Sequence, residues 1–369
     1  MKKMIFTAAM MLASAAAMAQ GGTFQIKGNV EGLPDSLVAM IGRKTENIEV
    51  KKKKFEFSKN FDKPQWVYLC DQKVIKSGAF SAIPVFAIPS ETIEMKGNFT
   101  GGVDIKGGKF YQEQDLMDEY KGQAYKDIKA LWKWYSDNVN DSNRDSIEKV
   151  VDERMEPLQK KYAADLLAYA KQHSDQECIA LLIDELDDVK DKETLISLMA
   201  DNVKNGRMKA YYEPIFERAK KRAEMEEKAK VVQASGVEAP DFTLNDINGK
   251  PFSLSSLRGK YVVIDFWGSW CIWCIKGMPK MKEYYEKYKG KFEILGVDCN
   301  DTEAKWKAAV EKHQLPWIHV YNPKGSDVLD KYAVQGFPTK IVIGPDGKIV
   351  KTIVGEDPAF YTLLDEVLK

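Results

Sequence analysis

The segment Asp265–Cys274 reads DFWGSWCIWC and ends in two cysteines three positions apart. It overlaps Tyr261–Trp267, a nearly continuous apolar run of the kind that forms a buried strand in a parallel sheet. Met278 and Met281 follow at helical spacing, so a helix is expected to begin around Cys271. Strand and helix patterns alternate from there to the C-terminus, which predicts an α/β sheet.

The two cysteines, Cys271 and Cys274, should share one face of that helix, close enough to form a disulfide with little rearrangement. Unpaired amides and the partial positive charge at a helix N-terminus favour thiolate over thiol at Cys271. We expect Cys271 to be exposed at the helix start and Cys274 to lie one turn inside. The pattern therefore predicts thiol–disulfide exchange, in which Cys271 attacks and Cys274 resolves the mixed disulfide.

A single carboxylate, Asp265, interrupts the apolar strand that precedes the cysteines. Burying a carboxylate is costly unless it has a partner or a role, and desolvation should raise its pKa. Near Cys274, such a group could take up the thiol proton as a general base. The alternative is that Asp265 points to a polar edge of the sheet.

The remaining cysteines, Cys70, Cys178 and Cys299, are scattered along the chain. With the three histidines they form no compact set of zinc ligands, and Ile275 occupies the position where covalent haem attachment needs histidine. We therefore expect neither a metal nor another cofactor. Cys70 and Cys178 are expected to be structural, whereas Cys299 is either a buried inert thiol or a third redox-active one.

The N-terminus has the features of an export signal. Lys2 and Lys3 precede the apolar segment Met4–Ala16, and Ala17–Ala19 fits a small-x-small cleavage site. We expect residues 1–19 to be a cleaved signal peptide, with an uncleaved anchor as the alternative. The mature chain is then expected to be a soluble periplasmic protein that needs no membrane contact and works in an oxidising compartment.

The composition and the patterning predict a multidomain α+β protein. The chain has 369 residues and equal numbers of basic and acidic residues, 55 of each, so a nucleic-acid partner is not expected. Residues 20–107 alternate like the strands of a β-sandwich, and residues 108–232 follow a helical period. The α/β pattern occupies residues 236–369.

The cysteine motif and a second motif downstream resemble a known fold. Asp265–Cys274 together with Gly336–Thr339 (GFPT) resembles the thioredoxin superfamily. The hairpin pattern at Asp241–Leu254 and the additional segment Asp301–Tyr321 resemble the TlpA/ResA-like thiol:disulfide oxidoreductases, an exported branch. The resemblance covers roughly Gly236–Lys369.

The resemblance implies a role for each motif residue. Cys271 is then the nucleophile, Cys274 the resolving thiol, and Asp265 the buried acid that exchanges protons. It also implies a cis peptide bond at Pro338, with the Phe337 backbone pairing with an extended substrate. The expected substrate-binding residues are Trp270, Ile272, Trp273, Phe337 and Pro338. The expected partners are exported proteins with disulfides or thiols, and a membrane-embedded electron donor.

Three positions depart from the family pattern. Ile272 and Trp273 stand between the cysteines in place of the Gly-Pro of thioredoxin, which leaves the reduction potential open. Gly277 stands where some exported relatives carry glutamate, so the acid role is expected to rest on Asp265 alone. The segment Phe292–Val297 lacks the lysine that thioredoxin places near its buried aspartate, which leaves the ionisation of Asp265 open.

Two other functions compete with disulfide exchange. A thiol peroxidase of the peroxiredoxin type shares the fold, but that family places Thr or Ser where this chain has Gly268. The other is a partner-binding protein, in which the first two domains bind the partner and the cysteines are an auxiliary redox pair.

Overall fold

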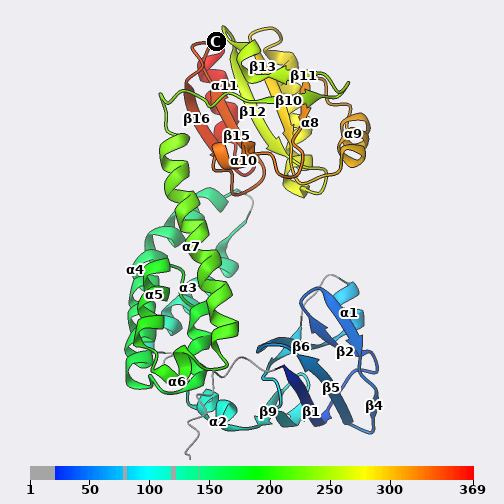
Figure 1. Ribbon diagram of the computed structural model, residues 1–369, viewed down its shortest axis with the longest axis vertical. Helices are drawn as coiled ribbons and strands as arrows, with labels where there is room; N and C mark the ends of the chain where they lie inside the picture. Colours follow the sequence, from blue (N-terminus) through cyan, green and yellow to red (C-terminus); the bar gives the residue numbers. More distant parts are fainter. Residues whose placement is uncertain (1–20, 78–80, 118–121, 141) are drawn as a thin grey trace, which may run out of the picture. The chain divides into compact units, whose positions relative to one another are not determined.

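The computed structural model describes residues 21–77, 81–117, 122–140 and 142–369, so the expected signal peptide, residues 1–19, lies outside the described residues. The chain divides into two compact units, Met1–Ala219 and Lys220–Lys369. The division falls inside the helix α7 (Lys209–Val232) (Figure 1). The domain limits 20–107, 108–232 and 236–369 remain predictions.

Two β-sheets begin the Met1–Ala219 unit (Figure 1). The larger contains, in spatial order, β4 (Val50–Lys51), β5 (Lys54–Phe61), β1 (Gly22–Glu31), β8 (Thr92–Asn98) and β9 (Gly102–Lys106). The smaller contains β3 (Lys44–Asn47), β2 (Leu37–Ile41), β6 (Gln65–Asp71) and β7 (Ala82–Ala87). Side chains alternate along β5, which buries Phe55, Phe57 and Phe61.

Helices make up most of the rest of this unit. They are α1 (Gln72–Lys76), α2 (Lys109–Leu116), α3 (Gln123–Asn138), α4 (Arg144–Gln172), the 3-10 helix η2 (Glu177–Asp184), α5 (Val189–Leu198), α6 (Asp201–Lys204) and the first part of α7. Phe86 of β7 stacks on Phe110 of α2, with ring centroids 5.2 Å apart. Strands and helices of this unit therefore bury a common hydrophobic core.

One mixed sheet organises the Lys220–Lys369 unit (Figure 1). Its spatial order is β11 (Pro251–Ser253), β10 (Thr243–Asp246), β14 (Ile318–Tyr321), β13 (Phe292–Asp298), β12 (Tyr261–Trp267), β15 (Thr339–Ile343) and β16 (Ile349–Val354). The helices are η3 (Leu254–Leu257), α8 (Ile272–Lys287), α9 (Glu303–Lys312), α10 (Val328–Lys331) and α11 (Ala359–Val367). This confirms the α/β architecture expected for the C-terminal region.

The apolar strand β12 lies inside this sheet, parallel to β13 and antiparallel to β15. Its side chains alternate between two hydrophobic clusters. Val263 and Trp267 pack with residues of α8 and α11, and Ile264 and Phe266 pack on the opposite face. Both faces of the sheet are covered, which explains why the strand is apolar throughout except at Asp265.

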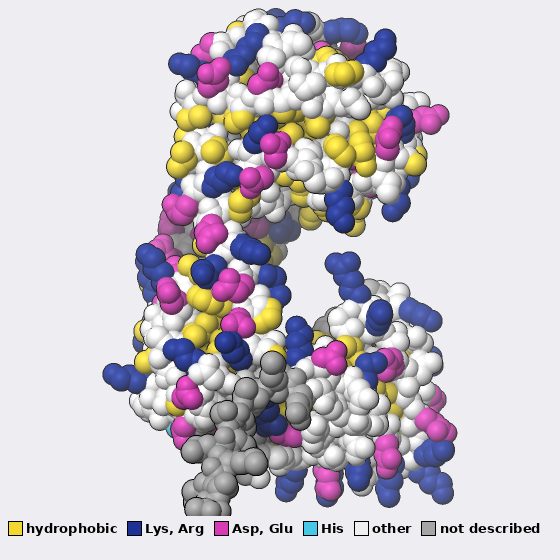
Figure 2. Space-filling model, in the orientation of Figure 1, with side chains coloured by type: hydrophobic (Ala, Val, Ile, Leu, Met, Phe, Trp, Pro, Cys, Tyr) yellow, Lys and Arg dark blue, Asp and Glu magenta, His cyan; other side chains and the backbone are white. Residues whose placement is uncertain are grey.

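The surface carries charges of both signs. On the face seen in Figure 2, lysine and arginine side chains are interspersed with aspartate and glutamate. Among the described residues, none of the helices combines the length and apolar character required to cross a membrane.

Candidate active site

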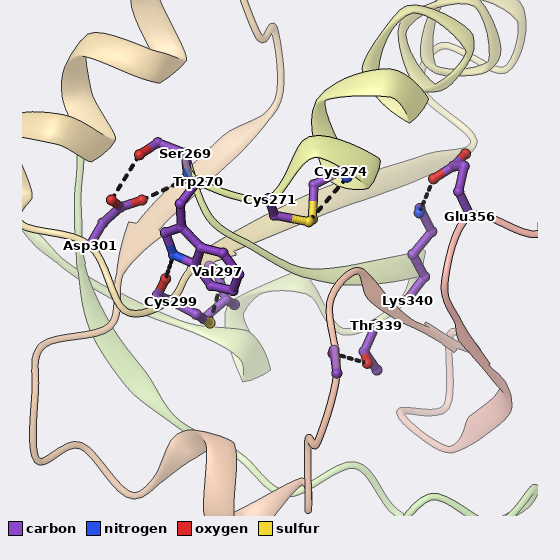
Figure 3. The surroundings of a disulfide bond; sticks show 11 residues. Ser269, Trp270, Cys271, Cys274, Val297, Cys299, Asp301, Thr339, Lys340 and Glu356 are labelled. Atoms are coloured by element: carbon purple, nitrogen blue, oxygen red, sulfur yellow. Dashed lines mark hydrogen bonds and ion pairs between the residues drawn. A yellow bond between two sulfur atoms is a disulfide. The ribbon is translucent and has the colours of Figure 1, made fainter. Parts of the chain in front are cut away.

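The cysteine pair lies where the chain passes from the end of β12 into the start of α8 (Figure 3). Cys271 is the N-cap residue of α8, and its Sγ accepts a hydrogen bond of 3.1 Å from the backbone amide of Cys274. The two residues are joined by a disulfide, with their Cα atoms 5.3 Å apart. The helix N-terminus is therefore directed at the sulfur of Cys271, the arrangement that stabilises a thiolate after reduction.

The expected difference in exposure between the two cysteines is wrong for the disulfide form. Cys271 is 5% exposed and Cys274 is 4% exposed. Both belong to the hydrophobic cluster that includes Trp267 and Met278. In this oxidised state, therefore, both cysteines of the disulfide are shielded from solvent.

Residues after β13 hold the loop that carries Cys271. The backbone amide and the hydroxyl of Ser269 donate hydrogen bonds of 2.7 and 2.8 Å to the carboxylate of Asp301. The indole Nε1 of Trp270 donates a 3.0 Å hydrogen bond to the carbonyl oxygen of Cys299 (Figure 3). These bonds fix the approach to Cys271 from the side of β13.

Large apolar side chains surround the cysteine pair on the surface. Trp270 is 49% exposed, Ile272 is 67% exposed and Trp273 is 60% exposed. The ring of Phe337 packs edge-on against Trp270, with centroids 5.3 Å apart, and the Phe337–Pro338 peptide bond is cis, as the resemblance implies. The Gly336–Thr339 motif is thus brought beside the Asp265–Cys274 motif.

Asp265 lies in the middle of β12 and is 5% exposed. Strand alternation places it on the same face as Val263 and Trp267, whose cluster includes both cysteines. Its Oδ1 atom has no hydrogen-bond partner among the described residues. Burial, opposed by the charge of Lys340, raises the pKa of Asp265 to about 6. The expectation that Asp265 is buried with a raised pKa is confirmed, which argues against a polar-edge position.

Asp265 has a buried charged neighbour. Its cross-strand neighbour on β15 is Lys340, which is only 1% exposed. The Lys340 ammonium forms a 2.8 Å ion pair with the Oε2 atom of Glu356, a residue two positions beyond the end of β16. The lysine absent from Phe292–Val297 on one side of β12 is therefore supplied from the strand on the other side.

The other cysteines are distant in the sequence and buried. Cys70, Cys178 and Cys299 are free thiols, each with no exposed surface. Burial, together with the charges of Asp298 and Asp265, raises the pKa of Cys299, so its thiolate is disfavoured. Within the described ranges, histidine, cysteine and carboxylate side chains do not assemble into a metal-binding group.

Sequence reasoning missed Lys340, Glu356 and Asp301. Lys340 had a usable signal, because it interrupts a strand whose other residues are apolar or Thr. Glu356 had none, since it follows Gly355 in what reads as an ordinary polar turn. The sequence marks Asp301 only as the start of the additional segment Asp301–Tyr321.

Residues 235–352 match the AhpC/TSA family. Thiol-disulfide oxidoreductase ResA of Bacillus cereus (strain ZK / E33L) is 43% identical over 122 residues, which cover 33% of this chain and 70% of that protein. ResA of Bacillus subtilis (strain 168) is 36% identical over 123 residues, which cover 33% of this chain and 68% of that protein. The solved thioredoxin domain of a thiol-disulfide oxidoreductase from Bacteroides vulgatus is 36% identical, with a TM-score of 0.35, and the match covers 37% of this chain and 99% of that domain.

The similarity to the two ResA proteins extends over more than two thirds of each of them. A shared fold alone would not assign a function, but this chain also has a disulfide-bonded cysteine pair at the start of a helix. Such a pair can accept two electrons from the thiols of other proteins or, once reduced, donate two electrons to their disulfides. The chain belongs to the ResA-like thiol–disulfide oxidoreductases of the thioredoxin superfamily.

Proposed function

We propose that this thiol–disulfide oxidoreductase reduces or isomerises disulfides in exported proteins, with Cys271 as attacking thiol and Cys274 as resolving thiol. The observation that carries the assignment is the hydrogen bond from the Cys274 amide to the Cys271 sulfur at the start of α8. Among the described residues, this bond stabilises negative charge at the first sulfur of the pair, and no such bond is directed at the second. Cys271 is therefore the better nucleophile after reduction.

The reaction begins with the reduced dithiol. The Cys271 thiolate attacks a substrate disulfide, so that a mixed disulfide forms and one substrate thiolate leaves. The Cys274 thiol then gives up its proton and attacks the Cys271 sulfur. The Cys271–Cys274 disulfide forms, the second substrate thiolate leaves, and two electrons have passed to the substrate.

Asp265 is the proposed acceptor of the Cys274 proton. Its pKa of about 6 leaves it ionised at neutral pH, yet close enough to the working pH to take up a proton. It has an Oδ1 atom without a hydrogen-bond partner among the residues described. After resolution of the mixed disulfide, Asp265 returns the proton to solvent.

The apolar side chains around the pair are the proposed substrate contacts. Exposed tryptophan rings in a small patch are typical of protein-recognition surfaces. The patch would contact side chains of an extended substrate segment, while the Phe337 backbone pairs with that segment as an added strand would. Its members are Trp270, Ile272, Trp273, Phe337 and Pro338.

Export to the periplasm is part of the proposal. It rests on the charged start, the apolar segment Met4–Ala16 and the cleavage pattern at Ala17–Ala19. A reductase in an oxidising compartment must be re-reduced, so we propose a membrane-embedded electron donor. Cell fractionation of the full-length chain tests this, since recovery in the cytoplasm with an intact N-terminus would contradict it.

A trapping experiment tests the roles of the two thiols. Cys274→Ser retains the attacking thiol and should capture exported proteins as mixed disulfides that dithiothreitol releases. The matched control, Cys271→Ser, should capture none. The wild-type protein should reduce insulin disulfides, and an absence of both capture and insulin reduction would favour the partner-binding alternative.

The reduction potential of the Cys271–Cys274 couple tests the direction of electron flow. A value near about −270 mV supports a reductase, whereas a value near about −120 mV indicates an oxidant and would overturn this part of the proposal. Equilibration with glutathione or dithiothreitol buffers, followed by alkylation and mass spectrometry, gives the potential.

The AhpC/TSA match favours a second candidate, the thiol peroxidase. The structure around Gly268 opposes it, because a Cβ atom there would lie 2.5 Å from Trp270 Nε1 and 2.8 Å from the Cys299 carbonyl oxygen. Thr or Ser, which the peroxiredoxin pattern needs at this position, does not fit. Consumption of hydrogen peroxide by the reduced protein separates the two functions, and turnover faster than with insulin would favour the peroxidase.

A further inference from the structure

The carboxylate of Glu356 fills the space above a glycine of the redox helix. A Cβ atom on Gly277 of α8 would lie 2.2 Å from the Oε2 atom of Glu356. The same carboxylate accepts hydrogen bonds from Lys340 Nζ at 2.8 Å and from the Tyr361 hydroxyl at 2.9 Å. The Glu356 side chain is 20% exposed, so it lies between the buried Lys340 and solvent. Gly277, which it covers, lies one turn along α8 from Cys274.

Lys340 has two anionic neighbours and bonds to one of them. Across the β12–β15 ladder it is the direct partner of Asp265, so both side chains leave the sheet on the same face. Its ammonium nevertheless points to Glu356, as Figure 3 shows. Among the described residues no ion pair joins Lys340 to Asp265 within 4 Å, although Lys340 is almost fully buried.

We propose that Glu356 is a positioning residue of the redox site: its carboxylate holds the Lys340 ammonium away from Asp265, and this leaves Asp265 free to accept the proton of Cys274. The inference rests on the proposed function of Asp265 and extends it. It also explains the bare helix position at Gly277, since any side chain there would displace the carboxylate.

Physical chemistry gives the direction of the effect. A buried ammonium that loses its acceptor will take the nearest remaining carboxylate, because an unpaired buried charge is costly. Pairing with Lys340 would stabilise the ionised form of Asp265, lower its pKa and make it a weaker base. The other titratable groups that Asp265 influences are Cys299 and Tyr361.

Two substitutions distinguish the two roles of Glu356, which binds the Lys340 ammonium and also contributes a negative charge near Asp265. Glu356→Ala removes both the charge and the acceptor, whereas Glu356→Gln keeps an acceptor oxygen. The titration of Asp265 is followed by carboxyl carbon-13 NMR of the full-length oxidised protein labelled in aspartate, with Asp265→Asn to assign the signal. We expect Glu356→Ala to move the midpoint down by roughly 1 to 3 pH units, and Glu356→Gln to move it less.

Further variants test whether the shift in the Asp265 midpoint is only a structural effect. In the Lys340→Met background, Glu356→Ala and Glu356→Gln should shift the Asp265 midpoint equally, because no ammonium remains to be redirected. Glu366→Gln, at an exposed position of α11, is the matched control and should not move the midpoint. Gly277→Ala leaves the charge of Glu356 in place but displaces its carboxylate, so it should lower the midpoint as Glu356→Ala does.

The pH profile of mixed-disulfide resolution is the functional readout and should move with the Asp265 midpoint. Equal shifts for Glu356→Ala and Glu356→Gln in the wild-type background, or no shift with either, would overturn the inference. In that case insulin reduction by the wild-type protein would still support the proposed function. Failure of the wild-type protein to reduce insulin would instead remove the proposed function.

Discussion

The two compact units both bury charged side chains, but they use them differently. In the Met1–Ala219 unit, the ammonium of Lys192 donates to the carbonyl oxygens of Ile183 and Leu186. This charge bonds to the backbone of η2 and of the residues that follow it. In the Lys220–Lys369 unit, Asp265 keeps an oxygen atom without a hydrogen-bond partner among the described residues.

The difference separates structural from reactive buried charge. A charge bonded to backbone groups stabilises the fold, because its removal leaves those groups unsatisfied. A buried carboxylate with an unpaired oxygen destabilises the fold, but it is available to take up a proton. Substitutions in the two units should therefore have opposite effects on stability, and only those in the second should alter the chemistry.

The largest expected effect is on the rate of resolution. Asp265→Asn removes the proposed proton acceptor and should slow release of substrate from the mixed disulfide at pH 7 by roughly 10² to 10⁴-fold. Stopped-flow fluorescence with a disulfide peptide measures this rate. The matched control is Asp298→Asn, a buried aspartate of the adjacent strand β13 whose pKa is raised to about 8 by burial and by Asp301. An equal loss in both variants would show that burial of any aspartate matters, rather than the position of Asp265.

The same substitution should stabilise the unit that it inactivates. The pKa of Asp265 rises from its ordinary 3.8 to about 6 on folding, so the folded state binds more protons between these values and loses stability as the pH rises through them. The cost is complete above about pH 6 and amounts to about 3 kcal/mol. Asp265→Asn should recover it at pH 7 and gain almost nothing below pH 3.8. Hydrogen exchange of peptides from β12 at both ends of this range measures the gain, and a gain independent of pH would contradict the assignment.

The opposite sign is expected in the first unit. Lys192→Met removes the donor to two buried carbonyl groups, so the free energy of unfolding should fall by about 2 kcal/mol. Hydrogen exchange of η2 peptides reports the loss, with the exposed Lys190→Met as control. Insulin reduction per folded molecule should not change. Slower insulin reduction by Lys192→Met would mean that this backbone-bonded charge also contributes to the redox reaction, as Asp265 is proposed to do.

The smallest expected effect concerns exposed aromatic side chains. Trp273→Ala should raise KM for a protein substrate by roughly 5-fold, about 1 kcal/mol, with little change in stability. Trp132 of the first unit is similarly exposed, at 53% against 60% for Trp273, and Trp132→Ala is the matched control. Steady-state kinetics with insulin distinguish them, and equal effects on KM would remove Trp273 from the proposed substrate surface.

The sequence pattern predicted those parts of the fold that depend on local periodicity. The apolar run before the cysteines, the helix after them and the hairpin Asp241–Leu254 all follow from spacing, and the structure contains each of them. Asp265 was predicted to be buried because a single carboxylate in an apolar strand is conspicuous.

The parts that were missed depend on contacts between distant segments. The pairing of Lys340 with Glu356 joins a strand to a turn beyond the next strand, and no spacing rule connects them. The shielding of Cys271 was also missed, because helix position predicts where a sulfur lies but not what covers it once oxidised.

The tight packing at Gly268 has a consequence for how this protein can evolve. A side chain there would collide with the indole of Trp270 and with the backbone at Cys299. Thr or Ser therefore cannot be introduced at position 268 while Trp270 keeps its hydrogen bond to that backbone. A variant of this protein that gains the peroxiredoxin residue at this position must also reposition the tryptophan, so the two changes are coupled through one glycine.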